Sequence, residues 1–247
     1  MQVEKITPYG DRRDKGSQVE EMFDSIAPAY DFMNRAMTLG IDRLWRRRAV
    51  SFIQKLTPAP RSVVDVATGT GDLAIALARR LPYAAITGVD LSEGMLDVGR
   101  RKAREARLDG RIQFLRGDGL ALPVADGSAD AVTIAFGIRN FADIPGGYAQ
   151  MFRALRPGGT IAVLELSTPV SPLVKPFYRL YTRCIIPFVG RIVSRDSRAY
   201  SYLPESIEAV PQGAAMTAIL AGAGFADCKA RTMTFGSCTL YTARKPS

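Results

Sequence analysis

The sequence predicts an α/β fold in which helices flank a mostly parallel sheet. Between residues 61 and 165, short apolar runs alternate with helical stretches, which is the pattern of repeated strand–helix units. The 247 residues are 47% hydrophobic and 23% charged, the balance of a globular chain. Because one core can serve a chain of this length, we expect a single domain over residues 1–247.

The expected elements follow one another in a regular order. Residues 1–60 are expected to form a mostly helical N-terminal extension that Pro28 interrupts. Buried strands then alternate with amphipathic helices, and a turn at 156–159 ends the last of these helices. After a further helix at 215–225, two strand-like runs around Gly236 predict a closing antiparallel hairpin, which gives seven strands in all. The strands are expected at 61–67, 84–90, 111–118, 129–136, 160–166, 227–235 and 237–244, and the helices between them at 73–81, at 93–108 and up to Leu155.

Composition excludes several classes of protein. Lys plus Arg number 33 against 24 Asp plus Glu, and the net charge of +9 suits an anionic partner without choosing one. The chain has no histidine, which removes the commonest general base and metal ligand. Three cysteines without metal-type spacing predict neither a disulfide framework nor a metal site, and they favour a reducing, cytoplasmic setting. We expect no secretory signal, because residues 1–16 carry charges and no apolar run. We expect no membrane span, because the longest uncharged stretch, 209–226, contains proline and several glycines.

The sharpest motif is the run VVDVATGTGDLA at residues 63–74. Asp65 ends the first strand, and Gly69 and Gly71 lie in the turn that opens the next helix, where glycine lets a ligand approach the backbone. One strand later, Asp90 stands where a carboxylate can accept hydrogen bonds from both hydroxyls of a ribose. The motif therefore predicts an adenosine-type cofactor at the carboxyl edge of the sheet.

The residues around this turn favour a positively charged cofactor. The phosphate-binding pattern G-x-G-x-x-G is incomplete, and Asp72 at the helix start would repel a pyrophosphate but tolerate a sulfonium. S-adenosylmethionine is therefore favoured over a dinucleotide, and a glycine turn used only for packing is the remaining alternative. Asp118 and Gly119 end the third strand at the same edge, where Asp118 either accepts a hydrogen bond from the adenine amine or serves as a turn residue.

Three separated motifs resemble those of a known family. The runs YDFMNRAMTLGIDRLWRR at 30–47, AFGIRN at 135–140 and LRPGGTIAVLELSTP at 155–169 resemble the menaquinone and ubiquinone biosynthesis C-methyltransferases, and SYLPESI at 201–207 extends the resemblance over nearly the whole chain. The resemblance implies a class I, Rossmann-like methyltransferase fold with S-adenosylmethionine as cofactor. It also implies methyl transfer to a ring carbon of a prenylated quinol. We expect the conversion of demethylmenaquinol to menaquinol, and methylation of 2-methoxy-6-polyprenyl-1,4-benzoquinol in the ubiquinone pathway is the alternative.

The resemblance also assigns residues to the cofactor. Carried over position by position, it implies four contacts, at Thr70, Asp90, Asp118 and Gly119. The chain departs from the family pattern at Asp42, where histidine is common, and at Ala135, where a serine often contacts the cofactor. Neither position is therefore expected to carry essential chemistry.

Three residues are candidates for the chemical step. Arg139 and Asn140 follow the fourth strand, where the donor methyl group is expected, and family analogy makes them substrate-side residues. Because arginine stays protonated, we expect Arg139 to stabilise the phenolate of the reduced ring; pairing with a carboxylate that fixes the loop is the alternative. Tyr30 and its neighbour Asp31 either cap the cofactor and relay the quinol proton or form the start of a helix. The identity of the proton acceptor stays open.

Residues 171–203 break the alternating pattern and combine aromatic with basic side chains. At helical spacing, this segment carries an apolar stripe beside a basic stripe, which is typical of a helix on a membrane surface. We expect it to cover the substrate site and to contact anionic headgroups at the inner face of the membrane, where an isoprenoid tail resides; a solvated helix covering the core is the alternative. The stripes consist of Leu173, Phe177, Leu180 and Tyr181, and of Lys175, Arg179 and Arg183.

Two other functions agree less well with the sequence. An RNA methyltransferase would use the same fold and positive charge, but AFGIRN replaces the Asn/Asp-Pro-Pro-aromatic motif used on amino groups of bases. We therefore expect no nucleic-acid partner. A non-enzymatic binding module of the same fold stays an alternative, and the sequence does not determine the oligomeric state.

Overall fold

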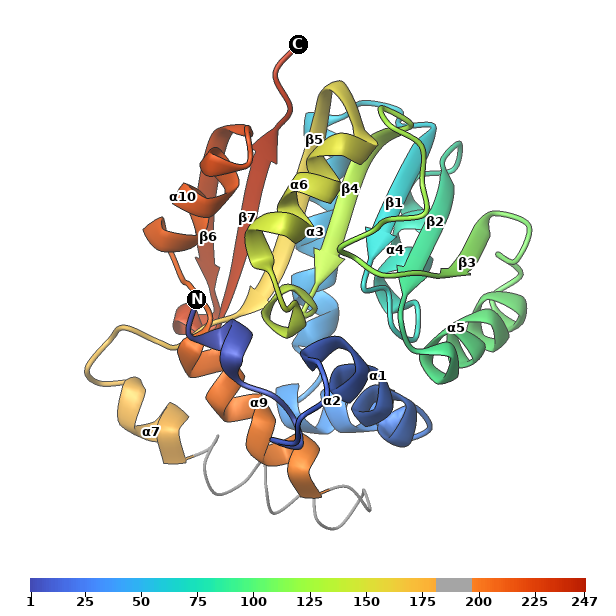
Figure 1. Ribbon diagram of the computed structural model, residues 1–247. Helices are drawn as coiled ribbons and strands as arrows, with labels where there is room; N and C mark the ends of the chain where they lie inside the picture. The colour runs from blue at the N-terminus through green and yellow to red at the C-terminus, as the bar shows by residue number, and fades with distance from the viewer. Residues whose placement is uncertain (181–196) are drawn as a thin grey trace.

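The described part of the chain is built on one sheet of seven strands (Figure 1). The computed structural model describes residues 1–180 and 197–247. The bounds of the strands are β1 Ser62–Val66, β2 Ala85–Asp90, β3 Ile112–Arg116, β4 Ala129–Ala135, β5 Leu155–Leu166, β6 Ala226–Met233 and β7 Cys238–Arg244. They lie in the order β3-β2-β1-β4-β5-β7-β6, and only the pairs that β7 makes with β5 and β6 are antiparallel. The predicted mostly parallel sheet with a closing antiparallel hairpin is confirmed.

Helices cover both faces of this sheet (Figure 1). Those packed on it are α3 Asp42–Leu56, α4 Asp72–Arg80, α5 Glu93–Glu105, α6 Ile144–Ala154 and α10 Ala214–Gly222. Val63 belongs to the buried cluster shared with α3, α4 and α5, whereas its neighbour Val64 belongs to the cluster shared with α6 and α10. Neighbouring side chains reach opposite clusters because a strand alternates its faces. Strands buried on both faces carry continuous apolar runs, and for this reason the sequence located them well.

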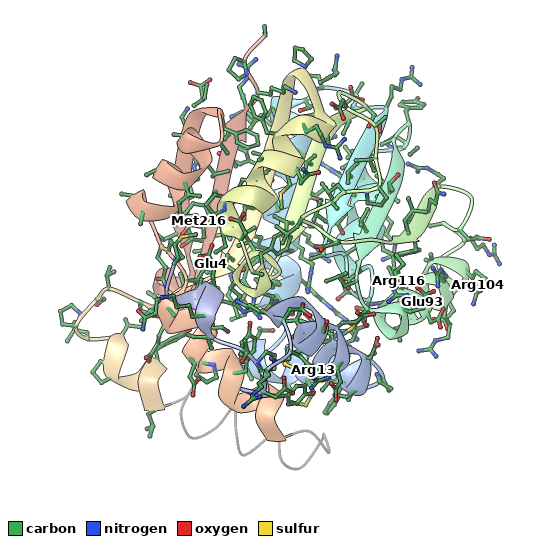
Figure 2. The ribbon with its side chains drawn as sticks, viewed as in Figure 1. Glu4, Arg13, Glu93, Arg104, Arg116 and Met216 are labelled. Carbon is green, nitrogen blue, oxygen red and sulfur yellow. The ribbon has the colours of Figure 1, made fainter. Side chains whose placement is uncertain are left out.

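The first helices of the N-terminal extension cover the edge where the parallel strands end (Figure 1). The extension contains α1 Lys15–Ile26 and α2 Tyr30–Thr38, which the expected break at Pro28 separates, and it lies beside α9 Ser197–Ala209. A buried cluster of Met22, Met33, Met95 and Tyr202 joins α1, α2, α5 and α9. Glu4 ties the first residues to the same region by accepting a hydrogen bond from the backbone N–H of Ile144 over 2.9 Å (Figure 2). The extension therefore encloses the edge at which the parallel strands end.

One expected boundary differs from the structure. The turn expected at 156–159 lies inside β5, which pairs with β4 at Leu155 and again from Thr160 onward, with an irregular register between them. Gly158, at φ 75°, allows the chain to leave the ladder and return to it. The sequence prediction of an ordinary turn there is wrong because a bulge and a turn use the same glycines.

The segment expected to cover the substrate site is described only in part. It includes α7 Lys175–Leu180 and the first half of α9, and α9 continues beyond residue 203. Of the two predicted stripes, Tyr181 and Arg183 lie outside the described residues. Leu173 and Leu180 are exposed. A search of the described residues found no helix that is long and apolar enough to span a membrane.

Candidate active site

A cavity of about 140 Å³, named here the edge cavity, lies at the carboxyl ends of β1, β2, β3 and β4. Ligands of open α/β sheets bind at this edge, because loops and helix starts converge there. Four of the residues predicted to bind the cofactor line the edge cavity, namely Gly69, Asp90, Asp118 and Gly119. Ala135, the position where the family often has serine, lines it as well.

Asp90 is the central carboxylate of the edge cavity. Its Oδ2 accepts a hydrogen bond from the backbone N–H of Gly69 over 2.7 Å, and its Oδ1 accepts one from Ser92 over 3.0 Å. Burial raises the pKa of Asp90 to about 6, although these two backbone donors oppose the rise. Each carboxylate oxygen has a further lone pair, so Asp90 can still accept hydrogen bonds from two hydroxyl groups of a ligand.

Asp118 and Gly119 form the far wall of the edge cavity. Asp118 is exposed, and its Oδ1 accepts a hydrogen bond from the backbone N–H of Leu120 over 2.8 Å, the geometry of a turn residue. Its other carboxylate oxygen can accept from a ligand amine. At Gly119, a β-carbon would overlap the ring of Phe141. Position 119 therefore needs glycine for this ring to pack against the cavity wall.

Asp65, Thr70 and Gly71 line neither this cavity nor the one described below. Asp65 is buried and accepts hydrogen bonds of 2.6 Å from the hydroxyls of Thr68 and Thr133, which fix the loop after β1. Burial raises the pKa of Asp65 to about 6. Gly71 adopts φ 77° at the start of α4, and a β-carbon there would lie 2.8 Å from the ring of Phe114. These contacts shape the glycine loop, and direct contact of the three residues with a cofactor stays a prediction.

The hydroxyl of Thr70 binds the N-terminal extension. It donates to Asp31 Oδ1 over 2.5 Å and accepts from Lys102 Nζ over 3.2 Å. Asp31 therefore links α2 to the glycine loop rather than capping its own helix. Sequence reasoning did not predict Lys102, because nothing in the pattern of α5 distinguishes it from the neighbouring basic residues.

Asp72 does not lie against the edge cavity, although the sequence argument used its charge to select the cofactor. Lys102 Nζ lies 2.5 Å from Asp72 Oδ1, and Arg46 Nη1 lies 3.7 Å from Asp72 Oδ2. Burial favours protonation of Asp72, but Arg46 and Lys102 outweigh it and hold the pKa of Asp72 below its ordinary value. The charge of Asp72 is matched within the protein, so the argument that it repels a pyrophosphate is wrong.

A second and larger cavity of about 340 Å³, named here the apolar cavity, lies under the N-terminal extension. Side chains from α1, α2, α3, α7 and α9 surround it, together with residues from the ends of β4 and β5. Its polar groups are few and include Asp42, Arg139 and Asn140. Its apolar lining includes Met22, Ile26, Met33, Met37, Ile41, Trp45, Leu166, Leu203 and Ile207.

The two cavities meet at four side chains that line both of them: Phe23, Tyr30, Phe136 and Asn140. Phe136 follows β4 and has a left-handed φ of 60°, a strained conformation of the kind that concentrates at functional sites. The Oδ1 atom of Asn140 accepts a hydrogen bond from the hydroxyl of Tyr202 over 3.1 Å. Burial raises the pKa of Tyr30, so its phenol stays neutral at physiological pH. The structure thus brings Tyr30 and Asn140, predicted from separate motifs, to one place.

Arg139 is buried in an ion pair with Glu165 of β5. Its Nη1 lies 2.8 Å from Glu165 Oε1 and also donates to the carbonyl of Phe136, while its backbone N–H donates to Glu165 Oε2 over 3.3 Å. The pairing with a carboxylate that the sequence left as an alternative is therefore present. The Nε of Arg139 is buried without a hydrogen-bond partner among the described residues, and Arg139 lines the apolar cavity. One donor thus stays available to a ligand.

Two residues that hold Arg139 were missed by sequence reasoning. Glu165 is 1% exposed, and the available signal was a lone acid within the apolar run TIAVLEL. Lys15 is also buried, and its Nζ donates to the carbonyls of Val3 and Arg139 over 2.7 and 3.1 Å. Burial lowers the pKa of Lys15 to about 8, and the charge of Arg139 adds to the effect. No periodic pattern marks Lys15, because only the folded extension brings it to this site.

The fold is that of the class I, Rossmann-like methyltransferases. A solved structure from Thermotoga maritima, described as an S-adenosylmethionine-dependent methyltransferase and possible histamine N-methyltransferase, matches with a TM-score of 0.64. It covers 91% of this chain and 99% of its own at 18% identity, which supports the fold alone.

The family is narrower than the fold. The model of the ubiE/COQ5 methyltransferase family matches residues 11–245, and the chain belongs to this family. A demethylmenaquinone methyltransferase of Bacteroides fragilis is 46% identical over 242 residues, 98% of each chain. A ubiquinone/menaquinone biosynthesis C-methyltransferase of Geotalea daltonii is 44% identical over 94% of this chain and 98% of its own. The prediction of an S-adenosylmethionine-dependent C-methyltransferase is thereby confirmed.

Proposed function

We propose that this protein transfers a methyl group from S-adenosylmethionine to a ring carbon of a prenylated quinol, converting demethylmenaquinol to menaquinol. The observation that carries the proposal is the meeting of the edge cavity with the larger apolar cavity at Tyr30, Phe136 and Asn140. A polar nucleoside and an apolar ring with an isoprenoid tail require two such environments in contact. The name of the Bacteroides fragilis relative supports the naphthoquinol substrate.

Methylation of a benzoquinol is the second candidate. The name of the Geotalea daltonii relative includes both the ubiquinone and the menaquinone pathways, which supports a dual or ubiquinone-pathway activity. The thioether and aliphatic side chains among the lining residues of the apolar cavity adapt to rings of different shape, so either ring can pack there.

The residues of the edge cavity fit the cofactor chemically. Asp90 offers two carboxylate oxygens for ribose hydroxyls, and Asp118 offers one for the adenine amine. Gly69 leaves the backbone open to close approach, because a β-carbon there would meet nothing within 4 Å. When bound, the cofactor supplies an electrophilic methyl group on a sulfonium. The protein aligns this methyl group with the ring carbon and excludes water, and positioning of this kind contributes up to about 7–11 kcal/mol.

Arg139 is proposed to stabilise the phenolate of the reduced ring. Burial opposes its charge, but Glu165 outweighs burial and raises the pKa of Arg139, so it donates hydrogen bonds and does not act as a neutral base. Its unpartnered Nε is the donor proposed for the substrate oxygen. Asn140 and Tyr30, at the junction of the cavities, are proposed to orient the ring. Arg139→Met should lower turnover while leaving the calorimetric affinity for S-adenosylmethionine near normal; loss of cofactor binding would contradict the role.

Transfer of an isotope-labelled methyl group tests the function directly. Purified protein is incubated anaerobically with labelled S-adenosylmethionine and, separately, with reduced demethylmenaquinone and reduced 2-methoxy-6-polyprenyl-1,4-benzoquinone. We expect label on the naphthoquinol ring. Label on the benzoquinol alone would reverse the order of the two candidates, and label on neither would leave the non-enzymatic alternative.

We also propose that residues 171–203 cover the apolar cavity and that this side of the protein touches an anionic membrane surface. Tyr178 and Tyr202 of this segment line the apolar cavity, which supports the covering role. Leu39, at the rim of this cavity, and Phe235, beside its lining residue Thr234, are 82% and 81% exposed, although both are apolar. Both have left-handed φ values, of 52° and 56°, so strained backbone presents them to solvent.

Flotation with liposomes tests the membrane contact. Each basic residue near an anionic surface contributes about 1 kcal/mol, so we expect binding to vesicles with anionic lipid that falls as salt rises. At each salt concentration, the double variant Leu39→Ser with Phe235→Ser should bind the anionic vesicles more weakly than the wild-type protein. Equal recovery with neutral and anionic vesicles, at every salt concentration, would count against this proposal.

A further inference from the structure

One carboxylate lines the apolar cavity within the described part of the chain. Five ionisable side chains line it there: Tyr30, Asp42, Arg139, Tyr178 and Tyr202. Burial raises the pKa of all three tyrosines, that of Tyr178 to about 12, and Arg139 stays protonated beside Glu165. The chain contains no histidine. Asp42 is therefore the candidate proton acceptor on this described surface, because it is the one carboxylate that lines the cavity there.

The Asp42 carboxylate is held rigidly at the start of α3. Asp42 is 1% exposed, its Oδ1 accepts a hydrogen bond from Thr38 Oγ1 over 3.0 Å, and its Oδ2 pairs with Arg46 Nη1. Two oxygens offer about four lone-pair positions, of which these partners fill two. Trp45 and Arg46, on the next turn of α3, both contact Phe136. The rings of Trp45 and Phe136 meet edge to face with centroids 6.1 Å apart, and the Arg46 guanidinium lies 5.3 Å from the centroid of Phe136. Asp42 thus lies one helical turn from the junction of the two cavities.

Asp42 belongs to a network of charged side chains from α2, α3, α4 and α5. Besides Asp42, Arg46 also pairs with Asp72 over 3.7 Å. Asp72 in turn shares Lys102 with Asp31. Arg46 and Lys102 therefore each bridge two carboxylates of this network. The exposed Arg35 of α2 adds a positive charge on the solvent side, where water screens it. The network consists of Asp42, Arg46, Asp72, Lys102 and Asp31.

We propose that Asp42 is a catalytic residue that accepts the proton of the quinol hydroxyl during methyl transfer, an inference that rests on the proposed function. The O–H bond breaks, its proton passes to Asp42, and its electron pair forms a ring carbonyl. The electron pair of the adjacent ring double bond forms the bond from the ring carbon to the methyl carbon. The methyl–sulfur bond breaks at the same time, and its electron pair stays on sulfur. The ring then releases its C–H proton to solvent while the oxygen takes its proton back from Asp42. One proton is released in all, and Asp42 ends as it began.

The proposal gives Arg139 and Asp42 different tasks. Arg139 holds the oxygen on which charge develops, whereas Asp42 removes the proton, so no free phenolate has to form in an apolar cavity. It also revises the expectation that position 42 carries no essential chemistry because histidine is common there. Histidine and aspartate differ in shape and charge, but the deprotonated form of each presents a hydrogen-bond acceptor to a hydroxyl group.

The pH dependence of three variants tests the proposal. Asp42→Asn removes the acceptor with little change in shape, and general bases contribute about 10²–10⁴-fold, so kcat at pH 7 should fall at least 100-fold. The kcat of this variant should then rise about tenfold per pH unit between pH 7 and 9, as the quinol increasingly ionises without help, whereas the wild-type value should change little. Asp42→His should restore activity at pH 8 and lose it below about pH 6.5, the ordinary pKa of histidine.

Asp72→Asn is the matched control, because it removes a carboxylate from the same network without lining either cavity. It should keep the wild-type pH profile, and calorimetry should show cofactor affinity within about threefold of wild type for all three variants. The inference is overturned if Asp42→Asn keeps kcat within threefold of wild type, if its loss is the same at pH 7 and 9, or if Asp72→Asn shows the same slope. If Asp42→Asn does not fold, the acid limb of Asp42→His decides. A wild-type protein that methylates neither quinol would refute the proposed function instead.

Discussion

Replacing Glu165 by leucine leaves the guanidinium of Arg139 buried without its carboxylate. The two side chains are 7% and 2% exposed, so water cannot take the place of the missing partner. Removal of one member of a buried ion pair costs about 3–5 kcal/mol of unfolding free energy. At about 2–4 °C per kcal/mol for a chain of this size, the melting temperature should fall by about 6–20 °C.

The double variant Glu165→Leu with Arg139→Met separates structure from chemistry. Apolar side chains of similar volume often replace a buried pair without loss, so the double variant should recover to within about 1 kcal/mol of wild type. It should nevertheless lack methyl transfer, because the donor proposed for the substrate oxygen is gone. Urea unfolding followed by circular dichroism gives the four free energies of the cycle, and calorimetry gives the melting temperatures.

Arg156→Met is the matched control for this cycle. Arg156 pairs with Asp130 over 2.5 Å, but its side chain is 55% exposed, so the change should cost no more than about 1 kcal/mol. A loss below 1 kcal/mol for Glu165→Leu would refute the reasoning, because the charge of Arg139 would then be solvated. A double variant no more stable than Glu165→Leu alone would show that Glu165 acts through packing and not through charge.

Three further predictions concern the edge cavity and the glycine loop beside it. Because ribose hydroxyls donate to the ionised form of Asp90 and its pKa is about 6, affinity for S-adenosylmethionine should be nearly constant above pH 7 and about tenfold weaker at pH 5 by calorimetry. Gly119→Ala should displace the ring of Phe141, lowering the free energy of unfolding by about 1–3 kcal/mol and weakening cofactor binding. Thr70→Val should lower it by about 1–2 kcal/mol by removing the bond to Asp31, with cofactor affinity changed less than threefold.

Each of these predictions has a distinct contrary result. Asp90→Asn serves as the control for the pH experiment, and an unchanged slope in this variant would assign the titration to another group. Normal cofactor affinity in Gly119→Ala would mean that Phe141 moves without affecting the edge cavity. A tenfold weaker affinity in Thr70→Val with normal stability would favour the direct contact that the family resemblance implies.

The sequence predicted the site residues best where their position depends only on the parallel strands that they follow. Gly69, Asp90 and Asp118 come after successive strands, and parallel strands bring their carboxyl ends to one edge whatever the details of packing. The position of a side chain within the same motif was harder to predict. Thr70 donates to Asp31 of the extension instead of lining a cavity, because the folded extension offers a carboxylate that the local sequence does not reveal.

The primary structure by itself determined the α/β architecture, the seven strands, the edge at which ligands bind and the methyltransferase family. These depend on periodicity and on motifs that are local in the chain, and a few residues suffice to specify them. Tertiary structure alone decided which side chains share a site: Glu165 with Arg139, Lys102 with Asp31 and Asp72, and Asp42 with the apolar cavity. Charge pairing and burial act over a few ångströms between residues that lie 26 to 71 positions apart, and only the packed chain sets those distances.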